Sequence, residues 1–351
     1  MTDPRAALAD LFRFQAVACR ELGSPLWAVV CDHLGNDAES GGPTFELLEP
    51  YAATSVGDAY ALRLLGGAHR LALVGDAPEL ASHLPSTGGD GDGGAAWDAL
   101  RALVVEPPAG LLDALTRPPQ TNEVGRSASL IGGFLVLAEE AGLPLRVLEI
   151  GTSAGLNLRF DQFRYEQGDL GWGPSSSRVQ FRGYWPSGLP PFGAPLTVTS
   201  RRGCDLDPVD VTTPEGRITL LSYVWPDQRE RFERTDAAIE IAAEVPASIE
   251  RADAPAWLAE HLDEAADDQT TVVFHSIMWQ YLSKDTRRAI RDVLDREGSS
   301  TTNRAPLAWL RLEPRADLPY PELRLTTWPG GNERLLANCS FHLGPVEWLP
   351  G

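Results

Sequence analysis

Residues 146–158 read RVLEIGTSAGLNL, and this run sets the expectation for the second part of the chain. The apolar run of Val147, Leu148 and Ile150 is typical of a buried strand. A turn with Gly151 and Gly155 follows directly, because glycine adopts backbone conformations that other residues avoid. Helical residues come next. A strand, a glycine-rich turn and a helix in this order indicate the first βα unit of a Rossmann-like parallel sheet.

Further strands are predicted downstream, and they alternate with helical stretches. They lie at Leu196–Asp207, Ala247–Ala254, Thr270–Leu282 and Ala308–Leu312. This alternation favours a mostly parallel α/β sheet. Leu323–Trp328 and Arg334–His342 then flank Pro329–Asn332 and predict a C-terminal antiparallel hairpin.

The first part of the chain is expected to form a separate helical domain at residues 1–120. Arg5–Glu21 has helical spacing of apolar residues, with Asp3-Pro4 to begin it. Thr121–Ala141 predicts a long helix, capped by Asn122 or Thr121. The Rossmann-like domain then covers residues 121–351, with an insertion at about 165–195 that is rich in glycine, proline and aromatics. That insertion is interpreted as either a lid or a merely connecting loop.

Composition excludes several classes of function. The 351 residues carry a formal net charge of −19, so nucleic acids and anionic membranes are not expected partners. No apolar run approaches the roughly 18 residues of a membrane span, and the start of the chain does not resemble a signal peptide. The 4 cysteines lie far apart, which argues against a metal site. We expect a cytoplasmic protein that acts on a small molecule; the sequence does not define its oligomeric state.

The acid before the first glycine indicates the kind of ligand. A dinucleotide fingerprint needs G-x-G-x-x-G, whereas this chain has G-x-x-x-G. Glu149 stands directly before that turn, where a carboxylate would repel a pyrophosphate and attract a cation. S-adenosylmethionine carries a sulfonium and an ammonium and has no phosphate, so it is the expected cofactor.

Residues Glu149–Gly155 resemble the first motif of class I methyltransferases, an acid followed by closely spaced glycines. The chain also resembles an uncharacterised actinobacterial family, the domain of unknown function 2332, in the stretches TNEVGRSASL, LEIGTSAGLNL, RRGCDLDPVD, YVWPDQRERFERTDAAI and VVFHSIMWQYL. The methyltransferase resemblance implies a methyltransferase-type Rossmann sheet in which Glu149, Gly151 and Gly155 face the methionine part of the cofactor. Ser153 stands where many such enzymes have glycine.

The same resemblance implies roles for two later acids. Asp205 would accept from both ribose hydroxyls, with Asp207 as the near alternative, and Asp253 would accept from the adenine amino group. Asp205 follows the first motif by about fifty residues, where about twenty are usual. The candidate cofactor-binding residues are therefore Glu149, Gly151, Thr152, Ser153, Gly155, Asn157, Asp205 and Asp253.

His275 is the candidate general base, because the fourth strand delivers it to the carboxyl edge of the sheet and an imidazole can titrate near neutrality. A structural histidine is the alternative. Three aromatic residues are candidates for a wall of the site or for core packing: Tyr223, Trp225 and Trp279. Asn122 and Arg126 are candidates to fold over the cofactor, although capping also explains Asn122.

The run Gly151–Gly155 also satisfies G-x-S-x-G, the nucleophile elbow of α/β-hydrolases. Ser153 would then be the nucleophile of an esterase, with Asp253 or Asp317 and His342 or His275 to complete a triad. The helical region before the elbow and the absence of an HGGG-type segment argue against this alternative. A third hypothesis is a binding protein of methyltransferase shape without catalysis. The favoured hypothesis is methyl transfer from S-adenosylmethionine to a small molecule of unknown identity.

Overall fold

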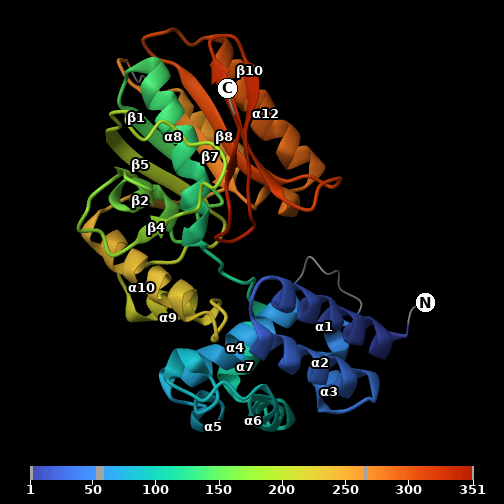
Figure 1. The fold of residues 1–351 in the computed structure, drawn as a ribbon. Helices are drawn as coiled ribbons and strands as arrows, with labels where there is room; N and C mark the ends of the chain where they lie inside the picture. The colour runs from blue at the N-terminus through green and yellow to red at the C-terminus, as the bar shows by residue number, and fades with distance from the viewer. Residues whose placement is uncertain (1–2, 53–58, 265–266, 350–351) are drawn as a thin grey trace. The chain divides into compact units, whose positions relative to one another are not determined.

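The structure, a computed structural model, describes residues 3–52, 59–264 and 267–349. The chain divides into two compact units (Figure 1). A helical unit comprises Met1–Thr121 and Thr213–Asp236, and a sheet unit comprises Asn122–Thr212 and Ala237–Gly351. Residues 213–236 therefore join the N-terminal region, although the sequence analysis assigned them to the second domain.

The helical unit is built from short helices around one apolar core. Its elements are α1 (Pro4–Glu21), α2 (Pro25–Glu39), α3 (Pro43–Leu48), η1 (Glu49–Tyr51), α4 (Tyr60–Val74), α5 (Pro78–Ala81), η3 (Pro85–Thr87), α6 (Gly93–Val105), α7 (Ala109–Thr116), α9 (Pro214–Ser222) and the start of α10 (Arg229–Glu244). Asp3 caps α1 by accepting from the Arg5 backbone N–H at 3.0 Å, as its position before Pro4 predicts. Phe12, Trp27 and Trp225 lie in the core.

Asp227, from the later segment of the helical unit, caps a helix that begins about two hundred positions earlier in the chain. Its carboxylate accepts from Ser24 Oγ at 2.5 Å and from the Leu26 backbone N–H at 2.9 Å, at the first turn of α2. This pair of bonds ties residues 213–236 to the N-terminal helices.

We expect Asp227→Ala to lower the free energy of unfolding by about 1–2 kcal/mol, because the substitution leaves an N-terminal N–H of α2 without its acceptor. Urea denaturation of wild type and variant measures the difference. Asp113→Ala is the matched control: Asp113 pairs with Arg117 on an exposed surface, and such pairs contribute about 0–1 kcal/mol. Equal losses in the two variants would contradict the capping role.

The sheet unit contains an eight-stranded sheet in the order β11-β10-β9-β8-β7-β1-β5-β6. The strands are β1 (Leu145–Ile150), β5 (Val198–Asp205), β6 (Ser248–Arg251), β7 (Thr270–Ser276), β8 (Leu307–Pro314), β9 (Pro321–Trp328), β10 (Asn332–Asn338) and β11 (Glu347–Trp348). Neighbours from β6 to β8 are parallel, and β9 to β11 are added antiparallel. The expected mixed α/β architecture with a mostly parallel sheet is confirmed. The chain order reverses between β1 and β7, and in open α/β sheets ligands bind outside the strand ends at that point.

Helices cover both faces of this sheet. Helix α8 (Ser127–Ala141) crosses one face (Figure 1), where Phe134 packs edge-on against Phe274 of β7 with ring centroids 5.2 Å apart. Helices α11 (Ala254–Leu262) and α12 (Lys284–Ser299) cover the other face and share a core with Leu148, Ile150 and Val273. Within the described residues, none of the helices combines the length and the apolar character needed to span a bilayer.

The connection into α8 differs from the expectation. Helix α8 begins at Ser127, after a 3₁₀ turn, η4 (Val124–Arg126), that Glu123 caps by accepting from the Gly125 N–H at 2.8 Å. Asn122 caps neither element, so that interpretation is wrong. Its Oδ1 instead accepts from the Leu156 backbone N–H at 2.8 Å. The segment before α8 is therefore tied to the glycine-rich turn after β1.

The insertion at about 165–195 forms a small sheet of its own. Its strands are β2 (Arg164–Gln167), β3 (Leu170–Trp172) and β4 (Gln180–Arg182), in the order β3-β2-β4. Tyr165, Phe181 and Trp185 are fully buried in it, and the Tyr165 hydroxyl donates to the Phe160 carbonyl at 2.8 Å. Residues just before and in β11 bond to the insertion, including the Trp348 N–H to the Ser187 carbonyl at 3.1 Å. The segment is thus a packed part of the sheet unit, with a core of its own.

Candidate functional site

The candidate site lies at the carboxyl edge of β1, β5 and β7, where the strand order reverses. After β1 the chain turns through three residues with left-handed backbone: Gly151 (φ +66), Ser153 (φ +51) and Gly155 (φ +69). This turn brings the Thr152 N–H to the Cys204 carbonyl of β5 at 3.1 Å. The element that follows, η5 (Leu156–Gln162), is a 3₁₀ helix with a kink, whereas the sequence predicts an α-helix. Gly151 is exposed, but Thr152 to Phe160 are all buried.

Glu149 is a buried acid at the end of β1, with 2% of its surface exposed. Burial raises its pKa to about 8, while the Thr152 hydrogen bond and the charge of Arg159 act in the opposite direction. The Thr152 hydroxyl donates to the carboxyl at 2.6 Å. The negative charge of Asp205 raises the pKa further. Glu149 is therefore protonated near neutral pH, and a cation placed beside it would favour its ionised form.

Arg159 is the buried cation of this region, and the sequence analysis did not single it out. Its guanidinium donates only to backbone carbonyls: Gly155 at 2.7 Å, Val245 at 2.9 Å and Ala242 at 3.3 Å. Burial lowers the pKa of this side chain to about 10. Ala242 lies in the last turn of α10 and Val245 just follows it, where a positive charge stabilises the helix dipole. The signal in the sequence is an arginine between two apolar residues, Leu158 and Phe160.

Asp205 ends β5 and lies against the turn, as its predicted role requires. Its Oδ2 accepts from the Ser153 N–H at 2.8 Å, and its Oδ1 accepts from the Asp207 N–H at 2.9 Å. Each carboxylate oxygen has two lone pairs, so capacity to accept remains. Asp207, the alternative, pairs with Arg251 at 2.6 Å on the exposed surface.

Two of the candidate residues hold the turn from inside. Thr152 is fully buried between Glu149 and Gly203. Asn157 is 1% exposed. Its Oδ1 accepts from the Ser127 hydroxyl at 2.7 Å, and its Nδ2 donates to the Glu123 carbonyl at 3.2 Å. Both side chains therefore position the loop, whereas Gly151 beside them is exposed.

Asp253 lies at the next strand end along the edge. It is exposed and occupies the N-cap position of α11, without a side-chain cap bond. The neighbouring Ala252 N–H donates to the Asp205 carbonyl at 3.0 Å. The fold therefore brings the two acids, Asp205 and Asp253, to adjacent strand ends, as the sequence predicts.

His275 lies on the opposite face of the sheet from Glu149. Glu149 pairs in register with Phe274, so the side chain of the next residue points to the α11 and α12 side. The His275 ring is fully buried, stacked on Trp279 at 5.1 Å and tilted against Trp309 at 5.9 Å. Its Nδ1 lies 2.7 Å from Glu313 Oε1. Nε2 has no hydrogen-bond partner among the described residues.

The turn after β7 joins the two sides at the carboxyl edge. Ile277 has a φ of +51, which is a strained conformation for a β-branched residue and costs about 1–3 kcal/mol. The turn places Met278 against Gly151: a Cβ built on that glycine would lie 2.9 Å from the Met278 Cε. Arg126 donates to the Ser276 carbonyl at 3.2 Å and to the Phe341 carbonyl at 3.3 Å. Arg126 therefore reaches the same edge as the glycine turn.

The three aromatic candidates belong to different units of the chain. Trp225 lies in the core of the helical unit, and Tyr223 packs where a Cβ on Gly66 would meet its ring. Core packing is the interpretation that fits these two residues. Trp279 belongs to the sheet unit and lies beside His275.

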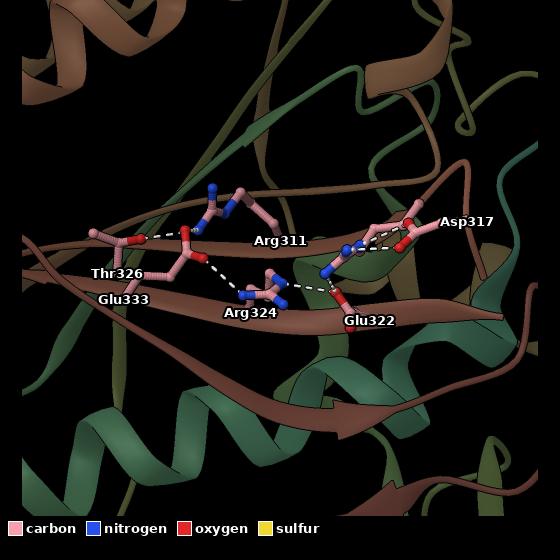
Figure 2. Close-up of polar contacts among 7 residues, drawn as sticks. Arg311, Asp317, Glu322, Arg324, Thr326 and Glu333 are labelled. Carbon is pink, nitrogen blue, oxygen red and sulfur yellow. Dashed lines mark hydrogen bonds and ion pairs between the residues drawn. The ribbon is translucent and has the colours of Figure 1, made fainter.

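Charged side chains form a strip across β8, β9 and β10 (Figure 2). Arg324 donates to Glu322 at 2.7 Å and to Glu333 at 2.7 Å, and Arg311 pairs with the same Glu333. Arg315 pairs with Asp317 at 2.8 Å. Cations and anions in the strip neutralise one another, so it is a self-contained ion-pair network and no anion site.

Comparison with known proteins gives one match. A family model described as "Uncharacterized protein conserved in bacteria (DUF2332)" matches residues 9–348. No curated protein and no solved structure matches the chain. The match confirms the resemblance to this family that the sequence stretches indicate.

Proposed function

We propose that this chain, which belongs to the DUF2332 family over nearly its whole length, binds S-adenosylmethionine at the carboxyl edge of β1 and β5 and transfers its methyl group to a small molecule. One observation carries the proposal. The Asp205 carboxylate lies 2.8 Å from the Ser153 N–H of the left-handed turn that follows Glu149. An acid therefore stands at the turn, at the reversal point where such sheets bind ligands.

The chemistry of the edge suits a cationic nucleoside better than a phosphate. Glu149, Asp205 and Asp253 are the acids at the ends of β1, β5 and β6. A pyrophosphate there would face negative charge, whereas a sulfonium or ammonium group would stabilise the ionised form of the buried Glu149. Met278 fills the place of a side chain on Gly151, but Gly151 itself is exposed, so a ligand can approach its main chain from the side that Met278 leaves open.

Within this proposal, each group has one task. Glu149 and Gly151 bind the methionine part, Asp205 accepts from the ribose hydroxyls, and Asp253 accepts from the adenine amino group. The cofactor, when bound, supplies a methyl group on a positively charged sulfur. His275 is the proposed base that takes the proton of the methyl acceptor.

Isothermal titration tests the cofactor directly. We expect binding of S-adenosylmethionine and of its demethylated product. We also expect Asp205→Asn to weaken binding about tenfold to hundredfold, because hydrogen bonds to a charged group contribute about 1.5–3 kcal/mol. Asn retains an oxygen that can accept from the Ser153 N–H, so the turn is preserved. Asp207→Asn, two residues away in an exposed ion pair, is the matched control and should bind as wild type. Absence of heat with both ligands would refute the proposal.

A serine hydrolase is the second candidate, and the backbone of Ser153 favours it. A nucleophile elbow places its serine on a strained turn after a strand, and Ser153 has a φ of +51 directly after β1. Two of the four candidate partners are engaged elsewhere: His275 bonds to Glu313 on the other side of the sheet, and Asp317 pairs with Arg315. We expect a fluorophosphonate probe to leave Ser153 unlabelled. Labelling that Ser153→Ala abolishes would favour the hydrolase.

A further inference from the structure

Glu313, at the carboxyl end of β8, collects three donors from β7 and the turn that follows it. Its Oε1 lies 2.7 Å from His275 Nδ1 and accepts from the Met278 N–H at 3.1 Å. Its Oε2 accepts from the Trp279 N–H at 3.2 Å. The side chain is largely buried, with 12% exposed. One carboxylate therefore holds both the imidazole and the strained backbone beside Gly151.

The turn needs such an anchor because its conformation is intrinsically unfavourable. Ile277 is β-branched and lies in the left-handed region. Strained residues of this kind persist only where surrounding contacts enforce them, and they gather at functional sites. Here the Ile277 N–H donates to the Leu312 carbonyl at 2.9 Å, and Glu313 binds the next two N–H groups. The strained turn is thus fixed from β8.

The contact with Glu313 also determines which imidazole nitrogen carries the proton. An ionised carboxylate only accepts hydrogen bonds, so the facing Nδ1 must donate. In the neutral ring the lone pair then lies on Nε2. That atom is buried and has no hydrogen-bond partner among the described residues. Buried polar atoms in proteins have hydrogen-bond partners as a rule. The lone pair on Nε2 therefore requires a hydrogen-bond donor.

Aromatic and charged residues lie around the His275 ring. Trp279 and Trp309 lie against the imidazole and keep bulk water from it. Arg291 stands over the Trp279 ring at 5.2 Å, and Arg311 pairs in register with His275 from β8. Glu322 faces Glu313 in register from β9.

We propose that Glu313 is the positioning residue of the site: it fixes the Nδ1–H tautomer of His275 and the Ser276–Trp279 turn, so that Nε2 receives a proton from a hydroxyl or amine of the acceptor. This inference rests on the proposed function for the identity of the reaction. In the step itself, the O–H or N–H bond of the acceptor breaks and its proton moves to Nε2. The resulting imidazolium is paired with the Glu313 carboxylate.

NMR of the ligand-free, full-length protein with ¹⁵N-labelled histidine tests the tautomer. We expect the His275 signal to show a protonated Nδ1 and an unprotonated Nε2. In Glu313→Gln, whose amide can donate as well as accept, we expect that signal to shift toward the other tautomer. Glu322→Gln, a neighbouring acid on the same face, is the matched control and should leave the His275 signal in place. A wild-type His275 protonated at Nε2, or a tautomer that Glu313→Gln does not change, would overturn the inference.

Activity gives a second readout that separates this inference from the cofactor proposal. We expect Glu313→Gln to lower kcat about tenfold or more, whereas Asp205→Asn acts on the Kd for S-adenosylmethionine. If S-adenosylmethionine does not bind wild type, the proposed function fails while the tautomer result still stands or falls by itself. If Glu313→Gln does not fold, the wild-type spectrum still decides which nitrogen is protonated. A variant with unchanged kcat and an unchanged spectrum would leave Glu313 without a positioning role.

Discussion

Replacing Glu149 with glutamine will stabilise the protein at pH 8 and change its stability little at pH 5. Burial raises the pKa of Glu149 to about 8 from its ordinary value of 4.5. Between these values the folded protein holds a proton that the unfolded chain has released. Unfolding therefore releases a proton, and stability falls as pH rises through this window, by about 1.4 kcal/mol per unit. Glutamine carries no ionisable proton, and its carbonyl oxygen still accepts from Thr152.

Urea denaturation of wild type and Glu149→Gln at pH 5, 6.5 and 8 measures this effect. The difference between the two proteins should grow with pH to roughly 3–5 kcal/mol at pH 8. Glu215→Gln is the matched control, since Glu215 has a side chain that is 69% exposed and pairs with Arg70. Its difference from wild type should stay small at all three pH values. A pH-independent difference for Glu149→Gln would show that the acid is ionised inside the folded protein.

Through Glu149, a rise in pH has opposite effects on ligand affinity and on the stability of the ligand-free protein. The proton that the buried acid retains must leave when a cationic ligand takes its place beside the carboxylate. Affinity for S-adenosylmethionine should therefore rise between pH 6.5 and pH 8.5, while the ligand-free protein becomes less stable over the same range. A buried acid that is costly to ionise is typical of a site built for a charged ligand.

Much of the sheet was predictable because strands of this fold carry local signals. The apolar runs at 147–150 and 272–274 became β1 and β7, and the acid after Cys204 indeed ends β5. The place of residues 213–236 was not predictable in this way. It depends on contacts such as Asp227 with Ser24, which lie about two hundred residues apart and which no local pattern encodes.

The site was predictable on one side of the sheet only. Glu149 and His275 both end strands, but their faces depend on the pairing register of β1 with β7, and a shift of one residue exchanges the faces. The role of Glu313 had a weak signal, an acid at the end of a strand. Its partners lie in a turn in which Ile277 has a left-handed backbone. β-branched residues rarely adopt that conformation, so the sequence does not predict the turn.

Replacing Arg159 with methionine will destabilise the protein by about 3–5 kcal/mol, because each buried acceptor left without its donor costs about 1–3 kcal/mol. Methionine fills much of the volume but leaves three carbonyls, those of Gly155, Ala242 and Val245, without their donor. It also removes a positive charge that lowers the pKa of Glu149. The pKa of Glu149 should rise further, so the loss in stability should grow as the pH rises above about 8, where Glu149 of the wild type begins to ionise.

The pH dependence distinguishes an electrostatic role of Arg159 from a purely structural one. The double variant with Glu149→Gln should show no growth of the stability loss above pH 8, because only the unsatisfied carbonyls remain. Arg251→Met is the matched control: Arg251 is 66% exposed and pairs with Asp207, and its loss should be within about 1 kcal/mol. If Arg159→Met is as mild as Arg251→Met, the buried guanidinium does not hold the turn to α10. The conformation of the glycine turn would then depend on its other contacts, including those with Asn122, Asp205 and Cys204.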